Sequence, residues 1–223
     1  MRITELILPV SDIPTVSAYF RDVLQLHVDK DKMAVGWSTL LLQTAGSRPV
    51  GGVHLAFNVP DNRFAEAMAW LRRRTPLQQD RDGKDYFALE SSWQSQSVYF
   101  TGPDGLILEL IGRRRLPASS QTGVFHGSEL TCLSEVGLPT ADVPAVQRTV
   151  SERFGLQPLS TPSAEFAPMG DDEGLLILSG IGRRWFPEQK DLPNAQGIEV
   201  VVLAGGRGGE CRDVVQGWRV QAR

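Results

Sequence analysis

Short apolar runs and one striped segment open the chain and predict a strand followed by a helix. Residues 3–10 are nearly all apolar, which is typical of a buried strand. Asp12 is a suitable helix N-cap, and Pro14 falls in the first helical turn. Apolar side chains three and four positions apart then form one helical stripe: Val16, Tyr19, Phe20, Val23 and Leu24. Strand-like runs follow at 33–37 and 39–44.

The same order of elements returns 130 residues later. Segments 4–14 and 134–144 share five identities in eleven positions without a gap. Asp142 and Pro144 repeat the helix start, and Gly155 is a suitable helix end. The ungapped match indicates an internal duplication.

Two further units start at Gly52 and Gly197. The first has a strand at 53–59, a helical stripe, and a hairpin whose turn is 102–105. The second begins with a similar strand, but the remaining elements of a unit are incomplete. Residues 212–219 are predicted to form either a helix or a strand. We therefore expect an α+β fold of tandem βαβββ units. A complete module would cover 1–115, a linker 116–128, and a shortened second module 129–223.

Composition excludes several classes of function. Twenty-three Lys and Arg against 26 Asp and Glu give a net charge of −3, which argues against a nucleic-acid partner. The two cysteines, Cys132 and Cys211, form neither a disulfide framework nor a metal pair, so a reducing cytoplasm is expected. No apolar run is long enough for a membrane span or a leader peptide. Three histidines without metal spacing exclude a three-histidine zinc site.

Four segments resemble the vicinal oxygen chelate superfamily, which includes glyoxalase I, extradiol dioxygenases and bleomycin-resistance proteins. They are 10–13, the helix end 19–26, the strand 53–57 and the hairpin 98–110. The last is the most specific, because a Pro-Asp-Gly turn precedes Glu109 and Leu110. The resemblance implies paired βαβββ units, each pair forming a curved sheet around a cup.

The resemblance also implies three metal ligands, Glu5, His54 and Glu109, on first and last strands of units. The family more often has His or Gln at the first position, so Glu5 is a departure. A fourth family position falls near Leu41 or Leu42 and is apolar. The implied cofactor is one divalent metal, with Mn, Fe, Ni, Co or Zn all compatible.

One imidazole and two carboxylates leave metal positions open for two vicinal substrate oxygens. No general base is assigned, although a ligand carboxylate, Glu109 or Glu5, could dissociate and accept a proton. Glu135 and Glu199 repeat the positions of Glu5 and His54, but no counterpart of Glu109 follows. The second module is therefore predicted to be structural and to cover apolar surface of the first.

These observations favour a metal-dependent enzyme of the glyoxalase or extradiol-dioxygenase type, acting on a small vicinally oxygenated substrate. The alternative is a non-catalytic protein that sequesters a small molecule, as bleomycin-resistance proteins do. A third class is a scaffold whose second module forms a lid or a homodimer contact. Strand alternation leaves three places open for six aromatic and polar residues: the lining of the cup, the core or the solvent face. They are Trp37, Trp93, Tyr99, Tyr86, Gln94 and Gln96.

Overall fold

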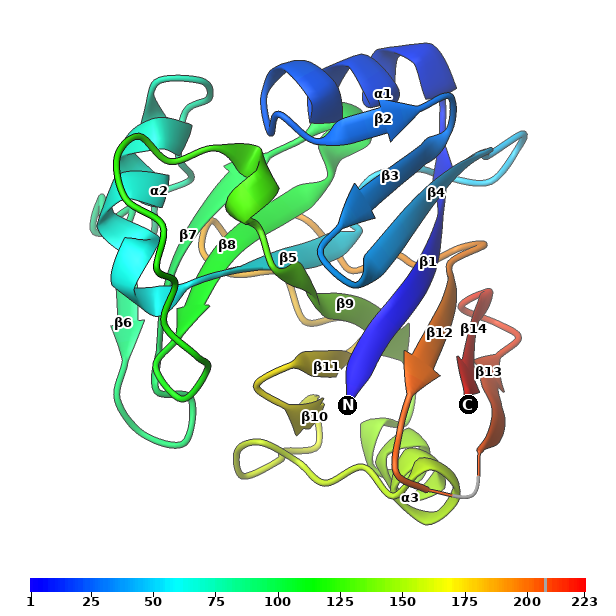
Figure 1. Cartoon of the computed structure of the whole chain (residues 1–223). Helices are drawn as coiled ribbons and strands as arrows, with labels where there is room; N and C mark the ends of the chain where they lie inside the picture. Colours follow the sequence, from blue (N-terminus) through cyan, green and yellow to red (C-terminus); the bar gives the residue numbers. More distant parts are fainter. Residues whose placement is uncertain (207) are drawn as a thin grey trace.

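The computed structural model describes residues 1–206 and 208–223 and contains two seven-stranded sheets (Figure 1). Sheet 1 has the spatial order β13 (Gly209–Asp213), β14 (Trp218–Ala222), β12 (Glu199–Leu203), β1 (Arg2–Val10), β4 (Ser38–Thr44), β3 (Lys32–Val35) and β2 (His27–Asp29). Sheet 2 has the order β10 (Phe166–Asp171), β11 (Gly174–Gly180), β9 (Cys132–Thr140), β5 (His54–Val59), β8 (Ile107–Arg113), β7 (Ser95–Thr101) and β6 (Phe87–Leu89).

Among the described residues, three α-helices accompany the sheets: α1 (Ile13–Asp22), α2 (Phe64–Arg72) and α3 (Val143–Phe154). Short 3-10 turns lie at Asp61–Arg63, Pro103–Gly105 and Gly127–Glu129. Asp12 caps α1 by accepting a hydrogen bond from the Thr15 amide, and Asp142 caps α3 in the same way. Gly155 ends α3 with a φ of 71°, a left-handed conformation that glycine adopts without steric cost.

Each repeated unit pairs its first strand in parallel with its last strand. This holds for β1 with β4, β5 with β8, β9 with β11, and β12 with β14. The units then join through antiparallel pairing of first strands, β1 with β12 and β5 with β9. Sheet 1 therefore combines the first and fourth units, whereas sheet 2 combines the second and third.

This pairing differs from the predicted arrangement in which each half of the chain forms its own module. Both sheets contain strands from 1–115 and from 129–223, because each first strand pairs with a unit from the other half. The predicted shortening does not leave an unfinished sheet. The fourth unit contributes β12, β13 and β14, so residues 212–219 form the ends of β13 and β14 and the turn between them rather than a helix.

One continuous apolar core lies between the sheets and under the helices. Leu133, Val200, Val202 and Trp218 are buried in it, as predicted for residues of the second half. The Trp218 indole also donates a 2.6 Å hydrogen bond to the Pro139 carbonyl, which links sheet 1 to β9. The buried Ser38 hydroxyl makes a second link, because it donates to Ile3 in sheet 1 and accepts from the Leu133 amide in sheet 2.

No helix among the described residues has the length and apolar character required to cross a lipid bilayer.

Truncation after Arg115 tests how strongly the halves depend on each other. The cut removes β9 from the side of β5 and β12 from the side of β1, leaving two long unpaired edges and an uncovered core. We expect the 1–115 fragment to aggregate or unfold, measured by size-exclusion chromatography and circular dichroism. A soluble, monomeric fragment as stable as the full chain would contradict this interdependence.

Candidate functional site

Strand alternation places three ionisable side chains on the face of sheet 2 opposite the main core. His54 opens β5, Glu109 lies in β8 beside Ala56, and Glu135 lies in β9 opposite Ala56. Their neighbours in sequence, such as Leu55 and Leu108, are in the main core, because successive side chains of a strand point to opposite faces.

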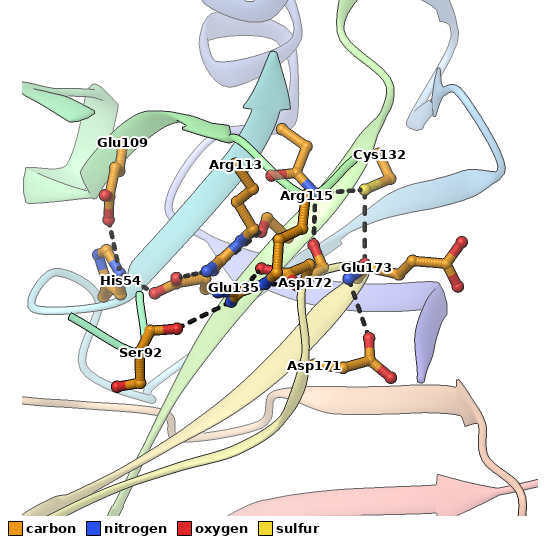
Figure 2. A network of polar contacts seen from close by, with 12 residues as sticks. His54, Ser92, Glu109, Arg113, Arg115, Cys132, Glu135, Asp171, Asp172 and Glu173 are labelled. Carbon is orange, nitrogen blue, oxygen red and sulfur yellow. Dashed lines mark hydrogen bonds and ion pairs between the residues drawn. The ribbon is translucent and has the colours of Figure 1, made fainter. Parts of the chain in front are cut away.

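The three side chains converge on one point (Figure 2). The His54 Nε2 atom lies 3.5 Å from Oε2 of Glu109 and 3.5 Å from Oε2 of Glu135. One donor atom from each residue lies within 4.8 Å of the others, and all three residues are buried. Ligand atoms around a zinc-sized ion are about 3.0–3.4 Å apart at normal bond lengths, so the two 3.5 Å distances from His54 are close to those of a divalent metal site.

Arg113 holds the other oxygen of Glu135. Its Nη2 atom donates to Oε1 of Glu135 at 2.5 Å, and its guanidinium also contacts the Ser134 hydroxyl at 3.4 Å. Ser134 is the extra residue of a β-bulge, since Ala56 pairs with Glu135 and Phe57 with Leu133. Arg113 is fully buried, so this ion pair fixes Glu135 and directs its free oxygen toward His54.

The two carboxyl groups have opposite pKa shifts. Burial and the nearby Glu135 carboxylate raise the pKa of Glu109 well above its usual range. Burial would also raise the pKa of Glu135, but the hydrogen bond from His54 and the Arg113 guanidinium outweigh it, so that pKa is lowered. Without a bound cation the cluster therefore favours one neutral and one ionised carboxyl group.

The cluster lies in the wall of a cavity of about 220 Å³. Aromatic and aliphatic side chains form most of the remaining wall, with serines and one arginine among them: Leu89, Trp93, Ser95, Ser97, Tyr99, Ile111, Phe166, Ile177, Arg183, Trp185 and Phe186. Burial and the Glu109 and Glu135 carboxylates raise the pKa of Tyr99 well above its ordinary value. Tyr99 therefore stays protonated at neutral pH and can donate a hydrogen bond into the cavity.

Trp185 sets the position of His54. Its indole donates a 2.8 Å hydrogen bond to the Gly52 carbonyl, and its ring centroid lies 5.1 Å from that of His54. Gly137 makes room for this packing, because a Cβ atom there would lie 2.6 Å from the Trp185 ring. The Nδ1 atom of His54 is buried without a partner among the described residues, so Nε2 is the nitrogen that faces the carboxyl groups.

The predicted residues separate between the two sheets. His54 and Glu109 come together, but Glu5 lies on β1 in sheet 1, beside Glu199 and Arg219. Of the predicted cup residues, Trp93 and Tyr99 line the cavity. Tyr86 and Trp37 are exposed; Tyr86 bonds to Gln96, and Trp37 stacks under Arg2.

Strand register shows that sheet 1 has equivalent positions with different chemistry. Val201 pairs with both Glu5 and Gln221, just as Ala56 pairs with both Glu135 and Glu109. Glu5 therefore corresponds to Glu135, and Gln221 corresponds to Glu109. Glu199 corresponds to His54, because each lies two residues before the pairing residue. Arg219 forms an ion pair with Glu199 and approaches Glu210 at 3.6 Å. The half-exposed Arg219 thus neutralises Glu199 within this group.

Glu135 lies in the site but is missing from the ligand set that was predicted from the sequence. The repeat offset identifies it as the equivalent of Glu5, and it lies in a run of uniformly buried strand residues. The strand pattern alone does not show that β9 pairs with β5. Leu41 and Leu42, where the fourth family position was predicted, lie on β4 in sheet 1 and not beside His54. In sheet 2 the corresponding place is taken by Ile177, which pairs with Gly137 as Glu109 pairs with Ala56.

Solved structures with the same overall fold cover nearly the whole chain. The crystal structure of a "putative dioxygenase" from Bacillus subtilis has a TM-score of 0.61 and 16% identity, covering 100% of this chain and 85% of its own. Glyoxalase I from Zea mays, as a point mutant, has a TM-score of 0.60 and 13% identity, covering 99% and 92%. No protein-family model matches the chain, and no curated protein matches its sequence. The likeness shows that this chain shares the overall fold of these two structures.

Replacing Arg113 by Met tests the buried ion pair. The Arg113→Met variant leaves the Glu135 carboxylate buried without its cation, which we expect to lower the free energy of unfolding by about 3 kcal/mol. Arg114→Met is the matched control, because Arg114 pairs with Glu90 at the surface and should change stability by about 1 kcal/mol or less. Urea denaturation measures both, and equal effects would contradict the importance of this pair.

The raised pKa of Glu109 predicts a pH-dependent stability in metal-free protein. Below the ordinary carboxyl pKa, folded and unfolded states are both protonated; as the pH rises, only the unfolded state ionises and stability is lost. Glu109→Gln removes this loss. Its melting temperature should therefore match that of the wild type near pH 4 and exceed it increasingly toward pH 7, measured by calorimetry with chelator. A constant difference across this range would contradict the raised pKa.

Proposed function

We propose that this protein is an enzyme that uses one divalent metal to act on a small substrate with two vicinal oxygens, as in glyoxalase or extradiol-dioxygenase chemistry. The observation that carries the proposal is the convergence of His54, Glu109 and Glu135 from three strands on one side of a cavity. Nitrogen and carboxylate donors suit Mn, Fe, Co, Ni or Zn. Three protein ligands leave positions free for substrate.

The bound metal would act as a Lewis acid that stabilises negative charge on the substrate oxygens. Residues of the chain would orient the metal ligands and the substrate. Arg113 keeps Glu135 oriented and ionised, and Trp185 keeps His54 in place while covering it from water. Tyr99, on β7 directly opposite Glu109, would donate a hydrogen bond to substrate or to that carboxyl group.

The proposed ligand set replaces Glu5 by Glu135. Both residues occupy the same position in the repeat, but only Glu135 shares a sheet face with His54 and Glu109. Gln221, Glu199 and Glu5 form the corresponding group in sheet 1, where Arg219 supplies the positive charge. One metal per chain is therefore proposed.

Binding without catalysis is the second candidate. It is favoured by Ile177, which puts an apolar side chain at the fourth ligand position, and by Arg113, which neutralises Glu135 without any metal. The cavity walls, rich in aromatic rings, would then sequester an apolar ligand. Metal content separates the two candidates.

Metal stoichiometry is the test. Protein purified without added metal or chelator should contain, or take up, about one divalent ion per chain, measured by plasma mass spectrometry. His54→Ala and Glu135→Gln should each lower metal affinity about tenfold or more. Mutating a residue that only hydrogen-bonds to a metal ligand already costs about tenfold, and these changes alter the ligands themselves. Removing the metal should leave the circular dichroism spectrum unchanged, because the core is complete without it.

Two matched variants serve as controls. His27→Ala removes an exposed histidine, and Glu5→Gln removes the carboxylate at the equivalent position of sheet 1. Neither should change metal affinity. Loss of metal in Glu5→Gln would restore Glu5 to the ligand set, and near-zero occupancy in every protein would favour the non-catalytic candidate.

A further inference from the structure

Arg183 is a cation in the cavity wall with no assigned role. It follows β11, and its backbone amide donates a 2.9 Å hydrogen bond to Gly180, which fixes the start of the segment. Its guanidinium carbon lies 4.3 Å from the ring centroid of Phe166, a stacked cation–π contact. Trp185 and Phe186, from the same segment, line the cavity beside it.

Apart from Phe166, the guanidinium contacts no bonding partner within residues 1–206 and 208–223, and the Glu165 carboxylate acts on it only through space. No hydrogen bond or ion pair from its side chain is formed there, whereas the neighbouring Arg184 bonds to the Lys190 carbonyl, and Arg115 forms an ion pair with Asp172. Arg183 is half-buried, and burial lowers its pKa, although an arginine stays charged at neutral pH. A partly desolvated guanidinium with free donors is costly unless an anion binds it.

Size and shape limit what that anion can be. The cavity of about 220 Å³ is larger than the ~150 Å³ of an apolar protein cavity that binds benzene, so it has room for a single-ring compound. Trp93, Tyr99 and Phe186 offer flat apolar surfaces for such a ring. Within the described chain, the ionisable side chains that line the cavity besides Arg183 are His54, Tyr99, Glu109 and Glu135.

We propose that Arg183 binds the carboxylate of a small, ring-sized organic acid that fills this cavity. The planar guanidinium, held on Phe166, presents paired donors that match the two oxygens of a carboxylate. The added claim that the acid also carries the vicinal oxygens of the substrate rests on the proposed function, since those oxygens would face His54 and the two glutamates.

Binding of benzoate to metal-free protein tests this role separately from the metal. Benzamide is the matched neutral probe, because it has nearly the same shape without the charge. NMR titration would follow the indole N–H signals of Trp93 and Trp185, which line the cavity. We expect benzoate to shift these signals and to bind about tenfold or more tightly than benzamide, as expected for a charge-assisted contact.

Variants assign the effect to Arg183. Arg183→Gln should remove most of the preference for benzoate, Arg183→Lys should retain part of it, and Arg184→Gln should leave it unchanged. Equal affinity for benzoate and benzamide, or full preference in a folded Arg183→Gln protein, would overturn the proposal. Should the metal test fail while the preference for benzoate holds, the metal-dependent function is lost but the anion site stands.

Discussion

The antiparallel pairing of β5 with β9 is the contact on which the candidate site depends. It joins the second and third units into one sheet and brings Glu135 beside His54 and Glu109, which lie 81 and 26 residues away in the chain. The bulge at Ser134 shifts the register at this junction, so that Leu133 packs in the main core while Glu135 faces the cavity. A regular ladder would have put these two residues on the same face.

Burial of charged groups determines the protonation states of the site residues. Two carboxyl groups and an imidazole share a water-poor pocket, where an uncompensated charge is expensive. Arg113 compensates only one of the carboxyl groups, and burial holds the other toward its neutral form. A divalent ion between the three side chains, as proposed, would favour the ionised form of Glu109 as well.

The two sheets share one geometry and have diverged in chemistry. Sheet 1 places Glu5, Glu199 and Gln221 where sheet 2 places Glu135, His54 and Glu109. In sheet 1, Arg219 forms surface ion pairs with Glu199 and Glu210, whereas in sheet 2 the guanidinium of Arg113 pairs with Glu135 and does not line the cavity. The position of one arginine therefore separates an internally neutralised group from a group able to hold a ligand.

Local sequence determined much of this protein. The apolar periods, the caps at Asp12 and Asp142 and the Pro-Asp-Gly turn specified the elements, and the family resemblance implied His54 and Glu109 as ligands. Tertiary structure decided which first strands pair, and hence that Glu135 rather than Glu5 lies beside them. All four first strands carry similar apolar patterns, so the local signal does not distinguish partners. That choice depends on the packing of distant segments, as does the burial of Arg113 and the exposure of Arg183 to the cavity.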